Sequence, residues 1–267
     1  MPIIQTNGID LFYQERGSGP PLLLIMGITA AGSVWEKHAA FWEKSFRCLL
    51  PDNRGVGKSS QPPGPYTSAM MADDLAGLLM QTVKEPVHVV GCSMGSIIAQ
   101  QLALRHPARV RSLVLMCPWA RCDAYARDLF ENMKTMKARF QPEEFVRYIQ
   151  LLIFAKKTWD TPDSLADFLQ AREEAARATE QQPLHALEAQ AAACVTHDVR
   201  KDLPQIRCPS LIIGGEADIF TPPWMAREVA DGIPNAEFHL YPEAGHAFHW
   251  EEIADFNPRI RDWLLAH

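Results

Sequence analysis

Short apolar stretches rich in Val, Ile and Leu recur in the first and last parts of this chain, and helix-like segments separate them. A continuous apolar run of about four to eight residues is typical of a strand buried on both faces, as in a parallel sheet. Such runs predict strands at residues 11–15, 22–26, 47–51, 87–91, 112–116, 210–213 and 237–240. The alternation of strands and helices predicts an α/β protein with a mostly parallel sheet covered on both faces.

The pattern changes between residues 118 and 202, where strand-like runs stop and Ala, Glu, Gln, Arg and Met recur at helical spacing. Helices are expected at residues 124–138, 142–154, 164–179 and 184–193, and a terminal helix near 250–265. Because the sheet pattern resumes near residue 206, we interpret 118–202 as a helical lid, or cap, inserted after the sixth strand. The core is then formed by residues 1–117 and 203–267. A separate helical domain is the less favoured alternative.

One apolar run leads directly into a serine that two glycines flank. The sequence Gly91-Cys92-Ser93-Met94-Gly95 has the spacing G-x-S-x-G, with a predicted strand before it and an apolar helix at 94–105 after it. This order is typical of a nucleophile elbow, in which a strained turn lifts the serine out of the sheet. Both glycines are expected because a Cβ at either position would clash. The alternative, a solvated serine in a tight turn, lacks this strand–helix context.

A serine hydroxyl needs a base and an acid that orients the base. His246 is the best candidate base, since it lies in a Gly-His loop between the last predicted strand and the terminal helix; His249 is its close competitor. Asp218 is the best candidate acid, because it directly follows the strand and glycine turn at 210–215. Glu216 is the rival acid, and Asp123 is a less favoured substitute.

Acyl transfer also needs two N–H donors for the oxyanion. The residue after the nucleophile, Met94, supplies the first in this interpretation. The second is expected from Ile28, in the loop that follows the strand at 22–26.

Two further motifs support a family resemblance. The run DNRGVGKS at 52–59 resembles a D-x-R-G-x-G-x-S turn, and RHPARV at 105–110 resembles the segment that joins the elbow helix to the next strand. With the order Ser93, Asp218, His246, the chain resembles the α/β-hydrolase-fold serine hydrolases along essentially its full length. Most relatives have His-Gly before the oxyanion loop, whereas this chain has Met26-Gly27. The backbone donor survives this change, but the support of the loop can differ.

The composition and charge of the chain limit the kinds of partner that it is expected to bind. The chain has 267 residues, 47% of them hydrophobic, and a formal net charge of −6. No cluster of Lys and Arg offers a phosphate-binding stripe, so a nucleic-acid partner is not expected. No segment is long and apolar enough to span a membrane, and no basic signal precedes the first strand, so a cytoplasmic location is expected.

The six cysteines lack metal spacing and are expected as free thiols. Neither a metal nor an organic cofactor is implied.

The resemblance also suggests a substrate class. The chain looks similar to small bacterial catabolic hydrolases, such as 3-oxoadipate enol-lactonases and aminoacrylate (carbamate-type) hydrolases. A small, anionic ester, enol-lactone or C–N substrate is therefore expected. Trp119 and Arg121, where the chain leaves the sheet, are candidate substrate-binding residues, and the arginine could hold a carboxylate. A surface arginine paired with a lid carboxylate is equally compatible.

Other activities share this constellation. The same triad can hydrolyse C–C bonds, and a cofactor-free haloperoxidase-like side activity is also compatible. A non-catalytic hydrolase-fold receptor ranks last, because all three triad members are present. Lid helices often mediate dimers in such folds, so a homodimer is compatible with the sequence.

Overall fold

The computed structural model describes residues 2–178 and 181–267. These residues form an eight-stranded sheet in the order β1-β2-β4-β3-β5-β6-β7-β8. Strands β3 to β8 are parallel, whereas β1 and β2 pair antiparallel with their neighbours. The predicted α/β fold with a mostly parallel sheet is therefore confirmed. The strands are β1 (Ile3–Thr6), β2 (Ile9–Arg16), β3 (Pro21–Ile25), β4 (Arg47–Pro51), β5 (Val87–Cys92), β6 (Val110–Met116), β7 (Ser210–Gly215) and β8 (Glu237–Tyr241).

The central strands are apolar throughout because both of their faces are covered. Side chains alternate between the two faces of a strand. In β3, Leu23 and Ile25 belong to one hydrophobic cluster, while Leu22 and Leu24 belong to the cluster on the opposite face. All four side chains are fully buried. This two-sided burial explains the continuous apolar runs from which the strands were predicted.

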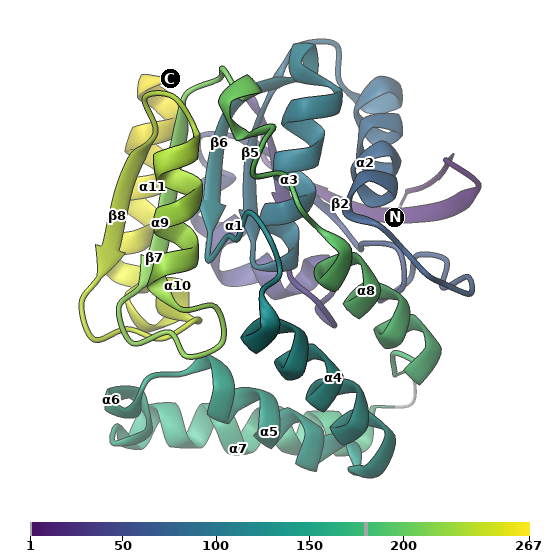
Figure 1. The fold of residues 1–267 in the computed structure, drawn as a ribbon, viewed down its shortest axis with the longest axis vertical. Helices are drawn as coiled ribbons and strands as arrows, with labels where there is room; N and C mark the ends of the chain where they lie inside the picture. The colour runs from purple at the N-terminus through teal and green to yellow at the C-terminus, as the bar shows by residue number, and fades with distance from the viewer. Residues whose placement is uncertain (1, 179–180) are drawn as a thin grey trace.

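Two groups of helices cover the sheet (Figure 1). Residues of α2, α3 and α9 belong to the cluster on one face, and residues of α1 and α11 belong to the cluster on the other. The α-helices of the core are α1 (Glu36–Trp42), α2 (Ser68–Thr82), α3 (Met94–Arg105), α9 (Pro223–Gly232), α10 (Phe248–Glu251) and α11 (Ile253–Ala266). The terminal helix expected near 250–265 is thus formed in two parts, α10 and α11.

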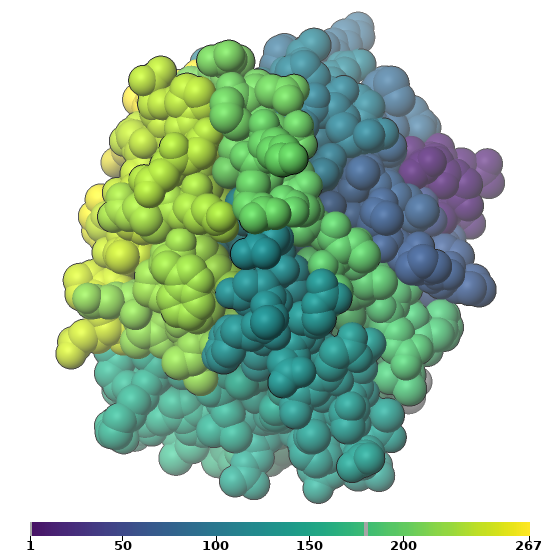
Figure 2. All heavy atoms as spheres, in the orientation of Figure 1, coloured from purple at the N-terminus to yellow at the C-terminus, as the bar shows by residue number. Residues whose placement is uncertain are grey.

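Five α-helices lie between β6 and β7 in the described part of the chain. We call this segment the helical insertion; its helices are α4 (Ala124–Arg139), α5 (Pro142–Ile153), α6 (Lys156–Trp159), α7 (Pro162–Arg177) and α8 (Leu184–Thr196). Four of them match predicted helices, whereas the short α6 was not predicted. The last residue of the helix expected at 164–179, Thr179, lies outside the described residues. In Figure 2 the teal atoms of α4 to α7 form the lower end of the molecule, toward which the strands β6 and β8 point in Figure 1.

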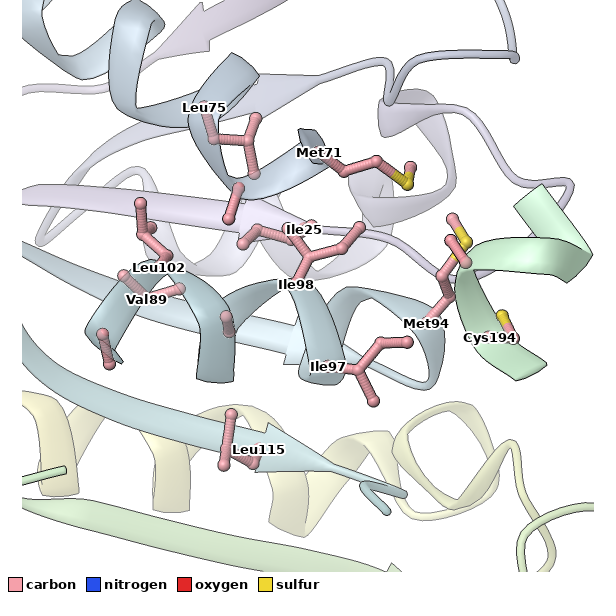
Figure 3. Packing of buried hydrophobic residues seen from close by; sticks show 14 of the residues in the cluster. Ile25, Met71, Leu75, Val89, Met94, Ile97, Ile98, Leu102, Leu115 and Cys194 are labelled. Atoms are coloured by element: carbon pink, nitrogen blue, oxygen red, sulfur yellow. The ribbon is translucent and has the colours of Figure 1, made fainter. Parts of the chain in front are cut away.

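Helix α3 joins the sheet to the helical insertion. Its residues Ile98 and Leu102 pack among the side chains of β3, β5 and α2, as Figure 3 shows. At its first turn, Met94 extends toward α8, which carries Cys194 (Figure 3). Both side chains are fully buried. The start of α3 is therefore packed against the insertion as well as against the core. No helix in the described part of the chain has the length and apolar content needed to span a bilayer.

A chain of buried polar side chains crosses the face covered by α1 and α11. His38 Nδ1 lies 2.6 Å from Asn257 Oδ1, and His38 Nε2 lies 2.9 Å from His249 Nδ1. His249 Nε2 in turn lies 3.9 Å from Cys92 Sγ. Burial lowers the pKa of His38 to about 4 and the pKa of His249 well below its usual range. Both rings are therefore neutral near pH 7, and His249, the competitor of His246 as base, is packed in this buried chain of side chains.

These rings should make the fold sensitive to acid. We expect the free energy of unfolding to fall when the pH is lowered from about 7.5 to about 5, because the unfolded chain, with histidine pKa values near ~6.5, binds protons first. The contribution of the neutral His38 ring is fully present above pH ~6.5 and is lost as the pH falls toward the folded pKa of about 4. At pH ~5 the loss from one such ring is about 2 kcal/mol. Urea unfolding at pH ~7.5 and at pH ~5 measures this change in the free energy of unfolding.

The variant His38→Gln removes one titrating ring, so its loss of stability between the two pH values should be smaller than that of the wild type. His185→Gln, which changes an exposed histidine, is the matched control and should keep the wild-type pH dependence. Equal pH dependence in all three proteins would contradict this account.

Candidate active site

Ser93 stands between β5 and α3 in a strained backbone conformation. Its φ is 54° and its ψ is −119°, a region that residues with a side chain rarely adopt. The Ser93 N–H donates to Met116 O at 2.9 Å. The Ser93 carbonyl accepts from the N–H of Ser96 at 2.8 Å and from its hydroxyl at 2.6 Å. These hydrogen bonds hold the sharp turn that the G-x-S-x-G spacing predicted.

Three glycines allow the backbone to close around Ser93. A Cβ on Gly91 would lie 2.4 Å from Gly95 O, and a Cβ on Gly95 would lie 2.1 Å from Ile25 O. Both distances are far below any real contact, so the expected clash is confirmed. A Cβ on Gly27 would lie 3.2 Å from Ser93 Cβ. The loop after β3 therefore runs directly beside the serine.

The Ser93 hydroxyl is buried, and no described residue accepts or donates a hydrogen bond to it. Two N–H groups belong to the backbone around it. Met94 is the first residue of α3, where an N–H has no partner within the helix. The Ile28 N–H follows Gly27 and makes no hydrogen bond with the residues at 2–178 and 181–267. Of the two predicted donors, Met94 therefore directly follows the serine, and Ile28 lies in the loop that runs beside it.

His246 is held by a carboxylate from a neighbouring loop. Its Nδ1 lies 2.8 Å from Asp218 Oδ2, and both side chains are buried. The other oxygen of Asp218 accepts from the N–H groups of Phe220, at 2.8 Å, and Thr221, at 2.9 Å. A carboxylate fixed in this way favours the tautomer with its proton on Nδ1, which leaves Nε2 free to accept a proton.

The rival residues lie elsewhere. Glu216 is exposed, and its carboxylate accepts from the N–H of Glu243 at 3.4 Å. Asp123 accepts from the N–H of Ala126 at 2.8 Å and so caps α4. Of the candidate acids, only Asp218 contacts a candidate base.

Thr221 contacts both Asp218 and His246, and the sequence analysis missed it. Its hydroxyl oxygen lies 3.0 Å from Asp218 Oδ2 and 3.0 Å from His246 Nδ1. The available signal was its position three residues after Asp218, a spacing at which an Asp side chain accepts from a backbone N–H. The structure shows that this local turn also places the threonine hydroxyl between the acid and the base.

Cys117 also approaches the pair, and its sulfur, His246 and Asp218 offer three possible metal ligands within 4.8 Å of one another. The Cys117 thiol donates to the His246 carbonyl at 3.3 Å. Burial and the nearby Asp218 charge raise the pKa of the thiol well above its usual range. A metal ligand must be a thiolate. In this structure the thiol is hydrogen-bonded to the His246 carbonyl and the imidazole to the Asp218 carboxylate, so the groups of the cluster are already occupied with one another.

The loop that contains Ile28 is supported by two amide side chains. Asn53 Nδ2 donates to Met26 O at 2.8 Å. Gln190, fully buried on α8, accepts from the Thr29 N–H at 3.0 Å and donates to Arg54 O at 2.8 Å. Where most relatives carry His-Gly, this chain therefore fixes the loop with Asn53 from the core and Gln190 from the insertion.

The insertion also contacts the loop that carries His246. The N–H of Ala247 donates to Ile153 O at 2.8 Å. A Cβ on Gly245 would lie 2.6 Å from the same oxygen, so only glycine fits there. The Glu251 carboxylate accepts from the N–H groups of Gly245, at 2.6 Å, and Ala155, at 2.7 Å. One acid thus joins the histidine loop to the insertion.

A cavity of about 1160 Å³ lies between the insertion helices α5 and α7 and the core loops near Thr29 and Trp250. Neither candidate substrate residue lines it. Trp119 is buried and packs against Phe130, with ring centroids 6.0 Å apart. Arg121 is exposed and forms an isolated bridge with Asp198 at the start of the insertion. Arg121 is therefore not at this cavity; its backbone pairs with Asp198 in an isolated β-bridge away from the cavity lining.

Comparisons with known proteins agree with this geometry. A family model described as "alpha/beta hydrolase fold" matches residues 20–253. A protein of Azorhizobium caulinodans named carbamate hydrolase RutD is 31% identical over 93% of this chain and 92% of its own length. A Mycobacterium tuberculosis protein named non-heme bromoperoxidase BpoC is 32% identical over 97% of this chain and 98% of its own. The enol-lactonase of Burkholderia xenovorans shares the fold, with a TM-score of 0.88 and 24% identity over 99% of this chain and 100% of its own.

The chain belongs to the α/β-hydrolase fold family. It is similar to small bacterial members of that family, as the sequence motifs indicated, and it is a hydrolase.

Gln190 should affect turnover through the loop that it holds. In Gln190→Met, the Thr29 N–H and the Arg54 carbonyl lose their partner, and the Ile28 N–H loses its fixed direction. We expect kcat to fall about tenfold, less than the ~10²–10³ for loss of an oxyanion donor. KM should change little. Steady-state kinetics on the fastest-cleaved substrate measures both.

Gln182→Met is the matched control, because Gln182 donates to Gln190 at 2.9 Å but makes no hydrogen bond to Thr29. Its kcat should stay within about threefold of the wild type. An unchanged kcat in a folded Gln190→Met variant, or equal losses in both variants, would refute the role of Gln190.

Proposed function

We propose that this protein hydrolyses carboxylic esters, including small lactones, through Ser93, His246 and Asp218. Two observations carry the proposal: a strained, buried serine whose hydroxyl has no partner among the described residues, and a histidine held by a buried carboxylate 2.8 Å away. An activated serine and an oriented base are what acyl transfer requires. Neither the family nor the named relatives fix the bond that is cleaved.

In the first half-reaction, Ser93 Oγ attacks the carbonyl carbon while His246 Nε2 takes the hydroxyl proton. The Ile28 and Met94 N–H groups stabilise the oxyanion. His246 then gives the proton to the leaving alkoxide, which departs as an alcohol and leaves an acyl group on Ser93. A water molecule attacks this ester with the help of His246, and the carboxylic acid is released. Asp218 stabilises the imidazolium in both halves, and Thr221 helps to hold Asp218 in place.

The helical insertion acts as a cap in this proposal. Residues 118–202 cover the site from the carboxyl ends of the strands, and Gln190 and Glu251 connect them to the oxyanion loop and the histidine loop. The core at 1–117 and 203–267 supplies the triad. In this proposal the core carries out the hydrolysis, and the cap selects the substrate.

Hydrolysis of a C–N bond is the second candidate. It is favoured by the relative named carbamate hydrolase, which is 31% identical to this chain. The triad chemistry is the same, and the two candidates differ only in the leaving group. A panel of matched esters and carbamates with the same acyl group distinguishes them by the ratio of kcat/KM values.

The serine can be tested directly. A fluorophosphonate probe should add once to the wild-type protein and not to Ser93→Ala, as intact-mass spectrometry would show. Hydrolysis of p-nitrophenyl acetate should fall in Ser93→Ala by about 10⁴-fold or more. A folded Ser93→Ala variant that keeps either the labelling or the turnover would exclude this mechanism.

The choice of acid can be tested with two isosteric changes. Asp218→Asn should lower kcat by up to about 10⁴-fold, because the amide favours the wrong histidine tautomer. Glu216→Gln, at the exposed rival acid, should leave kcat close to the wild-type value. The opposite order of the two effects would move the acid to Glu216.

A further inference from the structure

The cavity beside the proposed site is predominantly apolar. Its wall includes Phe145, Ile149 and Ile153 of α5 and Phe168 of α7, together with Phe154 and Trp250. The Phe154 ring lies 4.5 Å from the Phe168 ring and 6.1 Å from the Trp250 ring, measured between centroids. A volume of about 1160 Å³ is enough for a group of several carbon atoms.

This cavity adjoins both loops that the proposed mechanism uses. Thr29, which lines it, is the residue after the expected oxyanion donor Ile28. Ile153, on the opposite wall, accepts a hydrogen bond from Ala247, the residue after His246. Ser93, Asp218 and His246 are not themselves among the described lining residues. The cavity would therefore hold the part of a substrate that does not react, with the carbonyl extending from it toward these loops.

The charged groups around the cavity do not favour an anion. Its described lining includes three lysines and five carboxylates. Each lysine already has a neighbour: Lys37 lies 3.9 Å from Asp167, Lys157 pairs with Glu252, and the Lys137 ammonium lies 5.0 Å from the centre of the Phe145 ring. Three of the carboxylates are paired as well, Glu36 with Arg16, Asp167 with Lys37 and Glu252 with Lys157. A carboxylate-bearing substrate would therefore lose water against the apolar wall with little charge to compensate it.

We propose that the natural substrate places an uncharged, predominantly apolar group in this cavity. The substrate is thus a neutral ester or lactone with a hydrocarbon portion of several carbons, in place of the anionic substrate that the sequence suggested. The apolar wall removes that portion from water, at about 0.8 kcal/mol per buried CH₂. This inference rests on the proposed ester hydrolysis.

Two matched substrates test the charge. Methyl p-nitrophenyl adipate and p-nitrophenyl hydrogen adipate have the same acyl chain, but only the second ends in a carboxylate. We expect the neutral ester to have the higher kcat/KM, by about tenfold or more. Equal values, or a preference for the anionic ester, would overturn the proposal.

Two matched variants test the location. Ile149→Trp would fill part of the cavity, so the preferred chain length should become shorter among p-nitrophenyl acyl esters or among alkyl acetates. Leu151→Trp, two residues away on the same helix, changes a side chain that is 53% exposed and does not line the cavity. It should keep the wild-type preference. If Ile149→Trp does not fold, Ile149→Ala should shift the preference toward longer chains.

The outcomes separate the substrate from the mechanism. If esters are cleaved in a Ser93-dependent manner but Ile149 variants leave both chain-length profiles unchanged, the substrate inference fails and the proposed function stands. If no Ser93-dependent ester hydrolysis is found, the proposed function fails and the inference fails with it.

Discussion

The strained backbone of Ser93 is held by contacts from several separate parts of the chain. Met116 accepts its N–H, Ser96 donates twice to its carbonyl, and Gly27 lies against its side chain. A conformation of this kind costs about 1–3 kcal/mol and persists only where its surroundings determine it. The sheet therefore does more than support the serine. The register between β5 and β6 and the approach of Gly95 to β3 together hold the Ser93 backbone in this conformation.

The helical insertion is tied to both sides of this turn. On one side Gln190 holds the loop with Thr29, and on the other Ile153 and Glu251 hold the loop with His246. The N–H groups of Thr29, Gly245 and Ala247 are the core-loop partners in these connections, and the absence of a side chain at Gly245 allows the loop to approach Ile153. The insertion and these two loops are thus connected by a few partly buried hydrogen bonds. A change in the packing of α5 or α8 would be transmitted to the loops on either side of Ser93.

The neighbours of Ser93 are kept chemically neutral. Burial raises the pKa of the Cys92 thiol to about 12, and it lowers the pKa of His249, the ring nearest to that thiol, well below its usual range. Cys117, on the other side, also keeps its proton. Two thiols and a second imidazole therefore lie close to the site without offering a competing nucleophile or base. In the proposed mechanism, the reactive groups are therefore limited to Ser93 and to His246, which Asp218 orients.

Sequence patterns predicted the strands β2 to β8, most of the helices and the candidates Ser93, Asp218 and His246, but not β1. These features depend on local patterns: apolar runs for strands buried on both faces, glycine spacing at the elbow, and an acid or a histidine directly after a strand. Tertiary structure decided the rest, because it depends on segments far apart in the chain. Only the fold shows that Gln190 supports the loop with Ile28, that Thr221 lies between Asp218 and His246, and that Arg121 lies outside the cavity. No local pattern encodes a hydrogen bond between residues 29 and 190, since their meeting depends on how α8 packs against the sheet.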